Sequence, residues 1–72
     1  MNNSNPSIGF IGAGVFGKGL ALALATVGHH VAAVHSRSLS SAQGLAQPIP
    51  GCRVFTKHQD LADAVDLVFI TT

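Results

Sequence analysis

A glycine-dense turn between two apolar segments constrains the fold of this chain more than any other feature. The turn reads Gly12-Ala13-Gly14-Val15-Phe16-Gly17 and matches the pattern G-x-G-x-x-G. It follows the short β-branched and aromatic run 7–11 and opens a segment rich in alanine and leucine. A strand, a glycine turn and a helix in this order are typical of the start of a β-α-β unit. We therefore expect a buried strand of a parallel sheet to lead into this turn.

The segment after the turn has helical spacing. Phe16, Leu20, Leu24 and Val27 recur at i, i+4, i+8 and i+11, which is one stripe of a period of 3.6 residues. Gly28 follows this stripe, and a glycine in that position commonly ends a helix in a left-handed conformation. The pattern predicts a helix that uses the stripe for packing and stops at Gly28.

The rest of the chain continues to alternate strands with helical segments. Strand-like apolar runs cover 30–35, 53–55 and 67–71, and the helical segments between them cover 42–46 and 61–64. Ser38 or Ser40 can cap the first of these helices, and Asp60 can cap the second. The order β-α-β-α-β-α-β predicts an α/β fold with right-handed crossovers. We expect a parallel sheet in the order 3-2-1-4 with flanking helices, truncated after the fourth strand.

Each glycine of the turn has a task in a dinucleotide site. Gly12 permits the tight turn, Gly14 lets a pyrophosphate approach the backbone, and Gly17 lets the helix pack closely on the sheet. The start of the helix adds unpaired N–H groups and a partial positive charge. A glycine turn without a ligand is the alternative, and domains that bind S-adenosylmethionine or FAD use similar glycines. The strand-turn-helix context favours dinucleotide binding, and the other two classes usually have a carboxylate at the end of the second strand for the ribose hydroxyls.

The end of the second strand predicts which dinucleotide is bound. An acidic residue that accepts the ribose hydroxyls is expected about 20 residues after the motif. Ser36 stands near that position, and the chain contains no glutamate. Arg37 can hold a 2′-phosphate by two parallel charge-assisted hydrogen bonds, while the Ser36 and Ser38 hydroxyls donate to its other oxygens. The sequence thus favours NADP(H) over NAD(H); the alternative is a solvated loop whose arginine faces water.

These segments resemble the N-terminal domain of the 6-phosphogluconate dehydrogenase-like oxidoreductases. The likeness rests on 8–17, on Gly28-His29-His30-Val31 and on Ser36-Arg37-Ser38, and it covers nearly all of 7–72. This group includes β-hydroxyacid dehydrogenases, pyrroline-carboxylate reductases and deazaflavin-dependent NADP reductases, and the Rossmann-like NADP oxidoreductase branch is most similar.

The resemblance implies a Rossmann-type NADP-binding domain of an oxidoreductase that transfers a hydride to or from a small molecule. It also implies that Thr71 and Thr72 stand where the backbone passes near the cofactor. In the family, an all-helical C-terminal domain helps to form the substrate pocket, and many members take catalytic groups from it. We expect that domain to be absent here, so we assign no catalytic residue. The alternative is a non-catalytic nucleotide-binding module, or a fragment that needs a partner.

The remaining reactive side chains do not form an evident second site. The chain has four histidines, but a metal site needs three or four converging ligands, so we predict no metal. His35 alone could lie near the adenine of the cofactor. Cys52 has no base beside it in sequence and reads as a plain loop thiol. A helix cap and a solvated helix face explain the carboxylates of Asp60, Asp63 and Asp66.

Size and charge limit the partners of the chain. Its 72 residues make at most one small domain, for which we expect a loose leader at 1–6 and an incomplete dinucleotide-binding domain at 7–72. A net charge of +1 without a basic run indicates neither nucleic acid nor an anionic membrane as a partner. One cysteine and no secretory signal are typical of the cytoplasm.

The low charge also bears on association. Charged residues make up 10% of the chain, against about 25% in a typical soluble domain. We infer that part of the surface rests against more protein, either the missing C-terminal domain or a second copy in a homo-oligomer.

Overall fold

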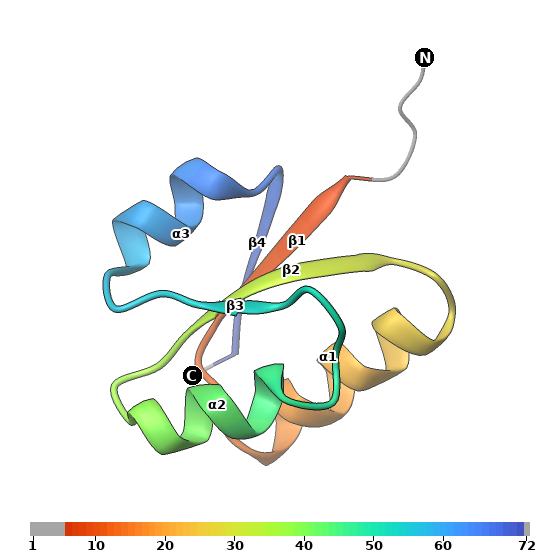
Figure 1. Ribbon diagram of the computed structural model, residues 1–72, viewed down its shortest axis with the longest axis horizontal. Helices are drawn as coiled ribbons and strands as arrows, with labels where there is room; N and C mark the ends of the chain where they lie inside the picture. The colour runs from red at the N-terminus through yellow and green to blue at the C-terminus, as the bar shows by residue number, and fades with distance from the viewer. Residues whose placement is uncertain (1–5, 72) are drawn as a thin grey trace.

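The computed structural model describes residues 6–71, in which strands and helices alternate (Figure 1). The elements are β1 (Ser7–Ile11), α1 (Val15–Thr26), β2 (His30–His35), α2 (Leu39–Ala46), β3 (Arg53–Val54), α3 (His58–Ala64) and β4 (Leu67–Ile70). All strand pairs are parallel, and the sheet has the order β3-β2-β1-β4. The predicted α/β fold and the order 3-2-1-4 are confirmed. Of the leader predicted at 1–6, residues 1–5 lie outside the described part of the chain, as does Thr72.

Helices cover both faces of the sheet, with α1 and α2 on one side and α3 on the other (Figure 1). The larger core lies on the side of α1 and α2, where Ile8 and Phe10 of β1 pack beside Val31 and Val34 of β2. All four side chains are buried, and Phe10 also contacts the ring of Phe69 in β4 at a centroid distance of 5.4 Å. Burial on both faces explains why the inner strands are almost continuously apolar.

The face under α3 is built from small residues. The pairing of β1 with β2 shifts register between Ile8 and Gly9, so that Gly9 pairs with Ala33. A Cβ atom added at Gly9 would lie 2.7 Å from Cδ2 of Leu61, which is a fully buried side chain of α3. The absence of a side chain at Gly9 therefore allows α3 to lie close to the sheet.

The apolar stripe predicted for α1 is only partly correct. Leu20 and Leu24 pack against the core, but Phe16 and Val27 are each 71% exposed. The buried residues of α1 are Gly17 and Ala21, so the helix turns its smallest residues toward the sheet and the leucines flank this contact.

The predicted end of α1 is confirmed. Gly28 has φ 97°, its N–H donates to Ala25 O, and the next N–H, of His29, donates to Leu24 O. These two bonds form a Schellman motif, in which a left-handed glycine satisfies the last carbonyls of a helix.

Helix caps follow the sequence at α2 but not at α3. Ser38 caps α2, since its Oγ accepts a hydrogen bond of 3.3 Å from the N–H of Ser41. The prediction that Asp60 caps the next helix is wrong. That helix begins earlier, after Lys57, whose carbonyl accepts the first helical bond from Leu61, so Asp60 lies within its first turn.

The prediction for Asp66 is also wrong, because this residue follows α3 and does not belong to its solvated face. Its carboxylate accepts hydrogen bonds from the N–H and the hydroxyl of Ser7, at 2.9 and 3.2 Å. The bonds join the starts of β1 and β4, which are remote in sequence. Asp66 thus acts as a link between two strands.

Candidate functional site

The glycine turn lies at the carboxyl edge of the sheet and is bonded to the strands on both sides of β1. The N–H of Gly12 donates to the carbonyl of His35, the last residue of β2, at 2.8 Å. On the other side, the N–H of Thr71 donates to Ile11 O at 2.9 Å, and the Thr71 hydroxyl donates to Gly12 O at 3.0 Å. Connections leave this edge in opposite directions from β1, which is where open α/β sheets bind ligands.

Two glycines of the turn are required by the geometry of the protein itself. Gly12 has φ 102°, a left-handed conformation that side chains disfavour. A Cβ atom added at Gly17 would lie 2.6 Å from Thr71 Oγ1 and 2.9 Å from Gly12 O. Glycine at these positions therefore lets the chain reverse out of β1 and lets α1 begin directly against the turn.

Gly14 differs from the other two because the space beside it is open. It is exposed, its φ is −74°, and an added Cβ would meet no atom within 4 Å. Gly14 is also the N-cap of α1, and no side chain caps this helix. The first helical bond is donated by Lys18 to Gly14 O, so the N–H groups of 15–17 have no partner within the helix. The result is an exposed stretch of main chain with free N–H donors at the positive end of a 12-residue helix, and the space beside Gly14 is open.

The other residues of the motif contribute in different ways. Ala13 is 4% exposed, and its side chain belongs to the core, so only its main chain can meet a ligand. Val15 is 92% exposed and Phe16 71%, so both apolar side chains project from the start of α1 into solvent. The turn therefore presents main chain with two apolar side chains beside it.

The loop 36–38 follows β2 at the same edge of the sheet. The Oγ of Ser36 accepts a hydrogen bond from the N–H of Ser38 at 3.3 Å, which leaves the Ser36 hydroxyl proton free to donate. The Ser38 hydroxyl caps α2 and lies 3.0 Å from Ser40 Oγ. Arg37 is exposed, and the loop 36–38 contains no acidic residue. Residues 36–38 thus form the loop that follows β2, the strand beside β1. Gly14 lies in the turn that follows β1.

His35 and His58 are neighbours at this edge, a contact that was not predicted from the sequence. His35 Nδ1 lies 2.9 Å from the carbonyl oxygen of Phe55, and the His35 and His58 ring centroids are 5.8 Å apart at an interplanar angle of 64°. The signal was present in the predicted strand order, since β3 beside β2 brings the residues after each strand together. The helical segment predicted at 61–64 did not include His58, whereas this residue opens α3.

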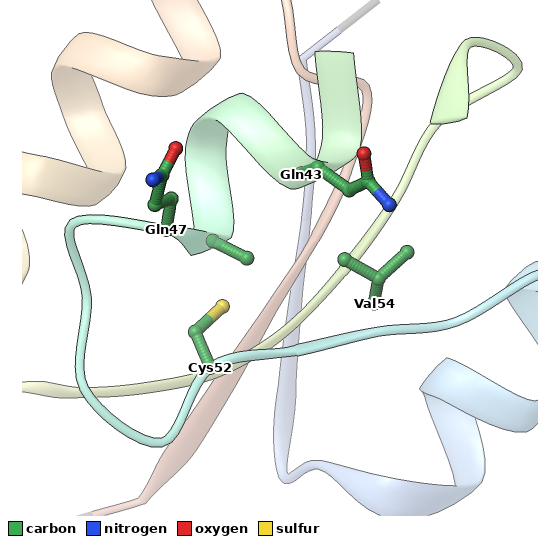
Figure 2. A pocket seen from close by; sticks show the side chains of 5 residues that line it. Gln43, Gln47, Cys52 and Val54 are labelled. Carbon is green, nitrogen blue, oxygen red and sulfur yellow. The ribbon is translucent and has the colours of Figure 1, made fainter. Parts of the chain in front are cut away.

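Cys52 faces a shallow cavity elsewhere in the molecule. The cavity has a volume of about 430 Å³ and lies between α2 and β3; Figure 2 shows the Cys52 thiol pointing toward α2, which carries Gln43. Burial raises the pKa of the Cys52 thiol to about 11, so the thiol is protonated and a poor nucleophile near neutral pH. None of the residues that line this cavity belongs to the glycine turn or to the loop 36–38.

The described part of the chain contains neither a cluster of metal ligands nor a membrane-spanning helix. Among residues 6–71, no three histidine, cysteine or acidic side chains converge as metal ligands would. None of the helices in this range has the length and apolar character needed to cross a bilayer.

Comparison with known proteins agrees with this geometry. A family model for "NADP oxidoreductase coenzyme F420-dependent" matches residues 7–72. The crystal structure of a "putative NADP oxidoreductase" from Bacteroides fragilis superposes with a TM-score of 0.85 at 29% sequence identity. The match covers 94% of this chain and 26% of that protein, so the chain spans about a quarter of the length of its structural relative. No curated protein sequence matches.

Proposed function

This chain belongs to the family of coenzyme F420-dependent NADP oxidoreductases, and from that membership we infer that residues 7–72 are the NADP(H)-binding domain of an oxidoreductase. The whole protein would transfer a hydride between the nicotinamide and a small molecule. The bound nicotinamide supplies the redox chemistry, and the residues of this chain bind and orient the dinucleotide.

The open space beside Gly14 and the free N–H groups at the start of α1 carry the proposal. A pyrophosphate there would accept hydrogen bonds from the N–H groups of 15–17, which the helix leaves without partners. Gly12 and Gly17 allow the conformation of the turn. The hydrogen bond from the Thr71 hydroxyl to Gly12 O stabilises it. Main-chain donors held in advance bind an anion without the cost of ordering flexible side chains.

Arg37 supports NADP(H) in preference to NAD(H). The guanidinium is exposed in the loop after β2, and an acidic residue that would repel a 2′-phosphate is missing from 36–38. The Ser36 hydroxyl proton is available to the same phosphate. With the pyrophosphate at Gly14, the adenosine half would extend over the end of β2 toward Arg37 and the nicotinamide half toward Thr71 and Thr72.

Substrate binding and catalysis are assigned to protein outside residues 7–72. We assign the substrate pocket and the catalytic groups to a helical C-terminal domain or to a second copy of the chain. The family description names coenzyme F420, which we place on the substrate side as hydride donor or acceptor. The single cysteine is consistent with work in the cytoplasm.

A titration with NADPH, NADH, FAD, S-adenosylmethionine and reduced F420 tests the assignment. We expect NADPH to bind at least about tenfold more tightly than NADH, since a charge-assisted hydrogen bond contributes about 1.5–3 kcal/mol. Arg37→Ala should lower the NADPH affinity to that of NADH. Arg53→Ala is the matched control, because it removes the same charge from β3, where Arg53 pairs with Ala33 and belongs neither to the glycine turn nor to the loop 36–38. Equal affinity of the wild-type protein for NADPH and NADH would refute the 2′-phosphate site.

A further inference from the structure

The imidazole rings of His35, at the end of β2, and His58, at the start of α3, form a pair at the carboxyl edge of the sheet. The carbonyl of His35 accepts the N–H of Gly12, so the histidine backbone adjoins the glycine turn. Its ring is held by Phe55 O at 2.9 Å, and a carbonyl only accepts, so Nδ1 carries the proton. The ring of His58, from the start of α3, meets the His35 ring edge to face.

The proposed cofactor position leaves one place for the adenine. A dinucleotide with its pyrophosphate at Gly14 and its 2′-phosphate at Arg37 must cross the end of β2. The glycine turn and β1 lie on one side of β2, and β3 lies on the other. The base, attached to the same ribose as the 2′-phosphate, then lies toward β3, where His58 is exposed and His35 is half-buried.

We propose that His58, supported by His35, is the platform on which the adenine ring of the cofactor stacks. The proposal rests on the proposed function, because it takes the positions of the two phosphates from it. An imidazole held by an edge-to-face contact keeps one face free for a purine, and stacking on such a ring tolerates any base. His58 would contact the base, while His35 is a positioning residue that orients His58.

The same pair does not make a metal site. Two imidazoles supply half of the ligands of a tetrahedral ion, and in residues 6–71 no third histidine, cysteine or carboxylate joins them. An aromatic platform uses both rings without further ligands.

Affinity measurements with NADP⁺ and with adenosine 2′,5′-bisphosphate test the platform. His58→Ala should weaken both about tenfold, the loss of a stacking partner at the lower end of its known range. His58→Phe keeps an aromatic face and should stay within about twofold of wild type. His30→Ala is the matched control, since His30 begins β2 at the opposite edge of the sheet, and it should change neither affinity.

The outcomes separate the two proposals. If wild type binds NADP⁺ and His58→Ala binds it equally well, the platform is wrong and the proposed function stands. If His58→Phe loses as much affinity as His58→Ala, stacking is refuted as the cause. If the wild-type protein binds no NADP⁺, both proposals fail.

A measurement on the wild-type protein avoids any effect of the substitutions on folding. The chain has four histidines, so its imidazole proton resonances form a small set that single replacements assign. Adding adenosine 2′,5′-bisphosphate should shift the ring protons of His58 and His35 through the ring current of the base. The signals of His29 and His30 should not move. Unchanged signals of His58 at saturation would overturn the proposal.

Discussion

Gly14 and Gly19 present the same space to an added side chain but border different parts of the molecule. At both positions a Cβ atom would meet nothing within 4 Å, and only Gly14 lines the turn. We predict that Gly14→Val leaves the melting temperature close to wild type and weakens NADP⁺ binding by at least about 2 kcal/mol, because the side chain fills the place of a pyrophosphate that makes charge-assisted bonds. Calorimetric titration and thermal melting measure the two effects.

Gly19→Val is the control for this experiment, since it adds the same side chain to the exposed surface of α1. It should leave both the affinity and the melting temperature nearly unchanged. An unaltered affinity in Gly14→Val would contradict the proposed pyrophosphate position, whereas unfolding of Gly14→Val would contradict the open space that the structure gives this residue.

The pKa of Cys52 makes the stability of the chain depend on alkaline pH. Burial raises it from 9.0 to about 11, so below pH 9 the thiol is protonated in both the folded and the unfolded chain. Between these values the unfolded chain releases its proton while the folded chain keeps it, and stability falls as the pH rises. We predict that the free energy of unfolding declines over this pH range and that the decline is smaller in Cys52→Ala. We also predict that the thiol is alkylated more slowly in the native protein than in the protein unfolded by urea. A native rate equal to that in urea would contradict the burial.

For single residues, the sequence predicted the local conformation and packing of the glycine turn. It did not predict contacts between residues that are far apart in the chain. The conformation of Gly12 and the close approach at Gly17 follow from the spacing of one short motif. The Asp66–Ser7 link and the His35–His58 contact join residues far apart in the chain. A solvated helix face was the simplest local role for the Asp66 carboxylate, whereas the tertiary structure bonds it to Ser7.

Among the elements, α1 shows why helical periodicity alone does not fix which face is buried. The predicted stripe chose the large apolar residues Phe16 and Val27, yet the helix packs through Gly17 and Ala21. Small residues let the helix axis come closer to the sheet, and the dispersion gained along the whole contact outweighs the exposure of two large side chains. Hydrophobicity scales score glycine and alanine weakly, so the pattern did not reveal this face.

The docking of α3 rests on one contact that substitution can test. Leu61 is fully buried, and a Cβ at Gly9 would lie 2.7 Å from its Cδ2 and 3.0 Å from Val65 Cγ2. We predict that Gly9→Ala costs about 1–3 kcal/mol through overpacking and Leu61→Ala about 2–4 kcal/mol through the cavity left behind. Urea denaturation measures both.

The double variant provides the sharper test of this contact. In Gly9→Ala/Leu61→Ala the shortened side chain leaves room for the new methyl group, so the cost should be less than the sum of the single effects. Gly44→Ala, within α2, is the control. A Cβ atom at Gly44 would meet only Lys18 Nζ, at an ordinary contact distance of 3.7 Å. It should raise stability by about 0.5–1 kcal/mol, because alanine favours a helix over glycine. Strict additivity of the pair would contradict the proposed contact.

For the whole molecule, the alternation of strands and helices was enough to predict the topology. Right-handed crossovers leave few arrangements for four parallel strands, and the order 3-2-1-4 places the glycine turn between two neighbours. The same topology makes β4 an edge strand. How much of its surface the helices cover could not be predicted, because the coverage depends on where α3 lies over the sheet.

The exposed edge at β4 leads to a prediction about the association of the chain. Leu67 is 47% exposed, Val68 38% and Ile70 70%, beside main-chain groups that no further strand pairs within residues 6–71. Apolar edge strands without charges or proline associate with other edges. We expect concentration-dependent self-association in sedimentation experiments, which Val68→Lys should weaken about tenfold by placing a charge in the contact. Val27→Lys introduces the same charge at an equally apolar site, 71% exposed at the end of α1, and should leave association unchanged. Equal effects of the two lysines would show that net charge, and not the edge of β4, controls the association.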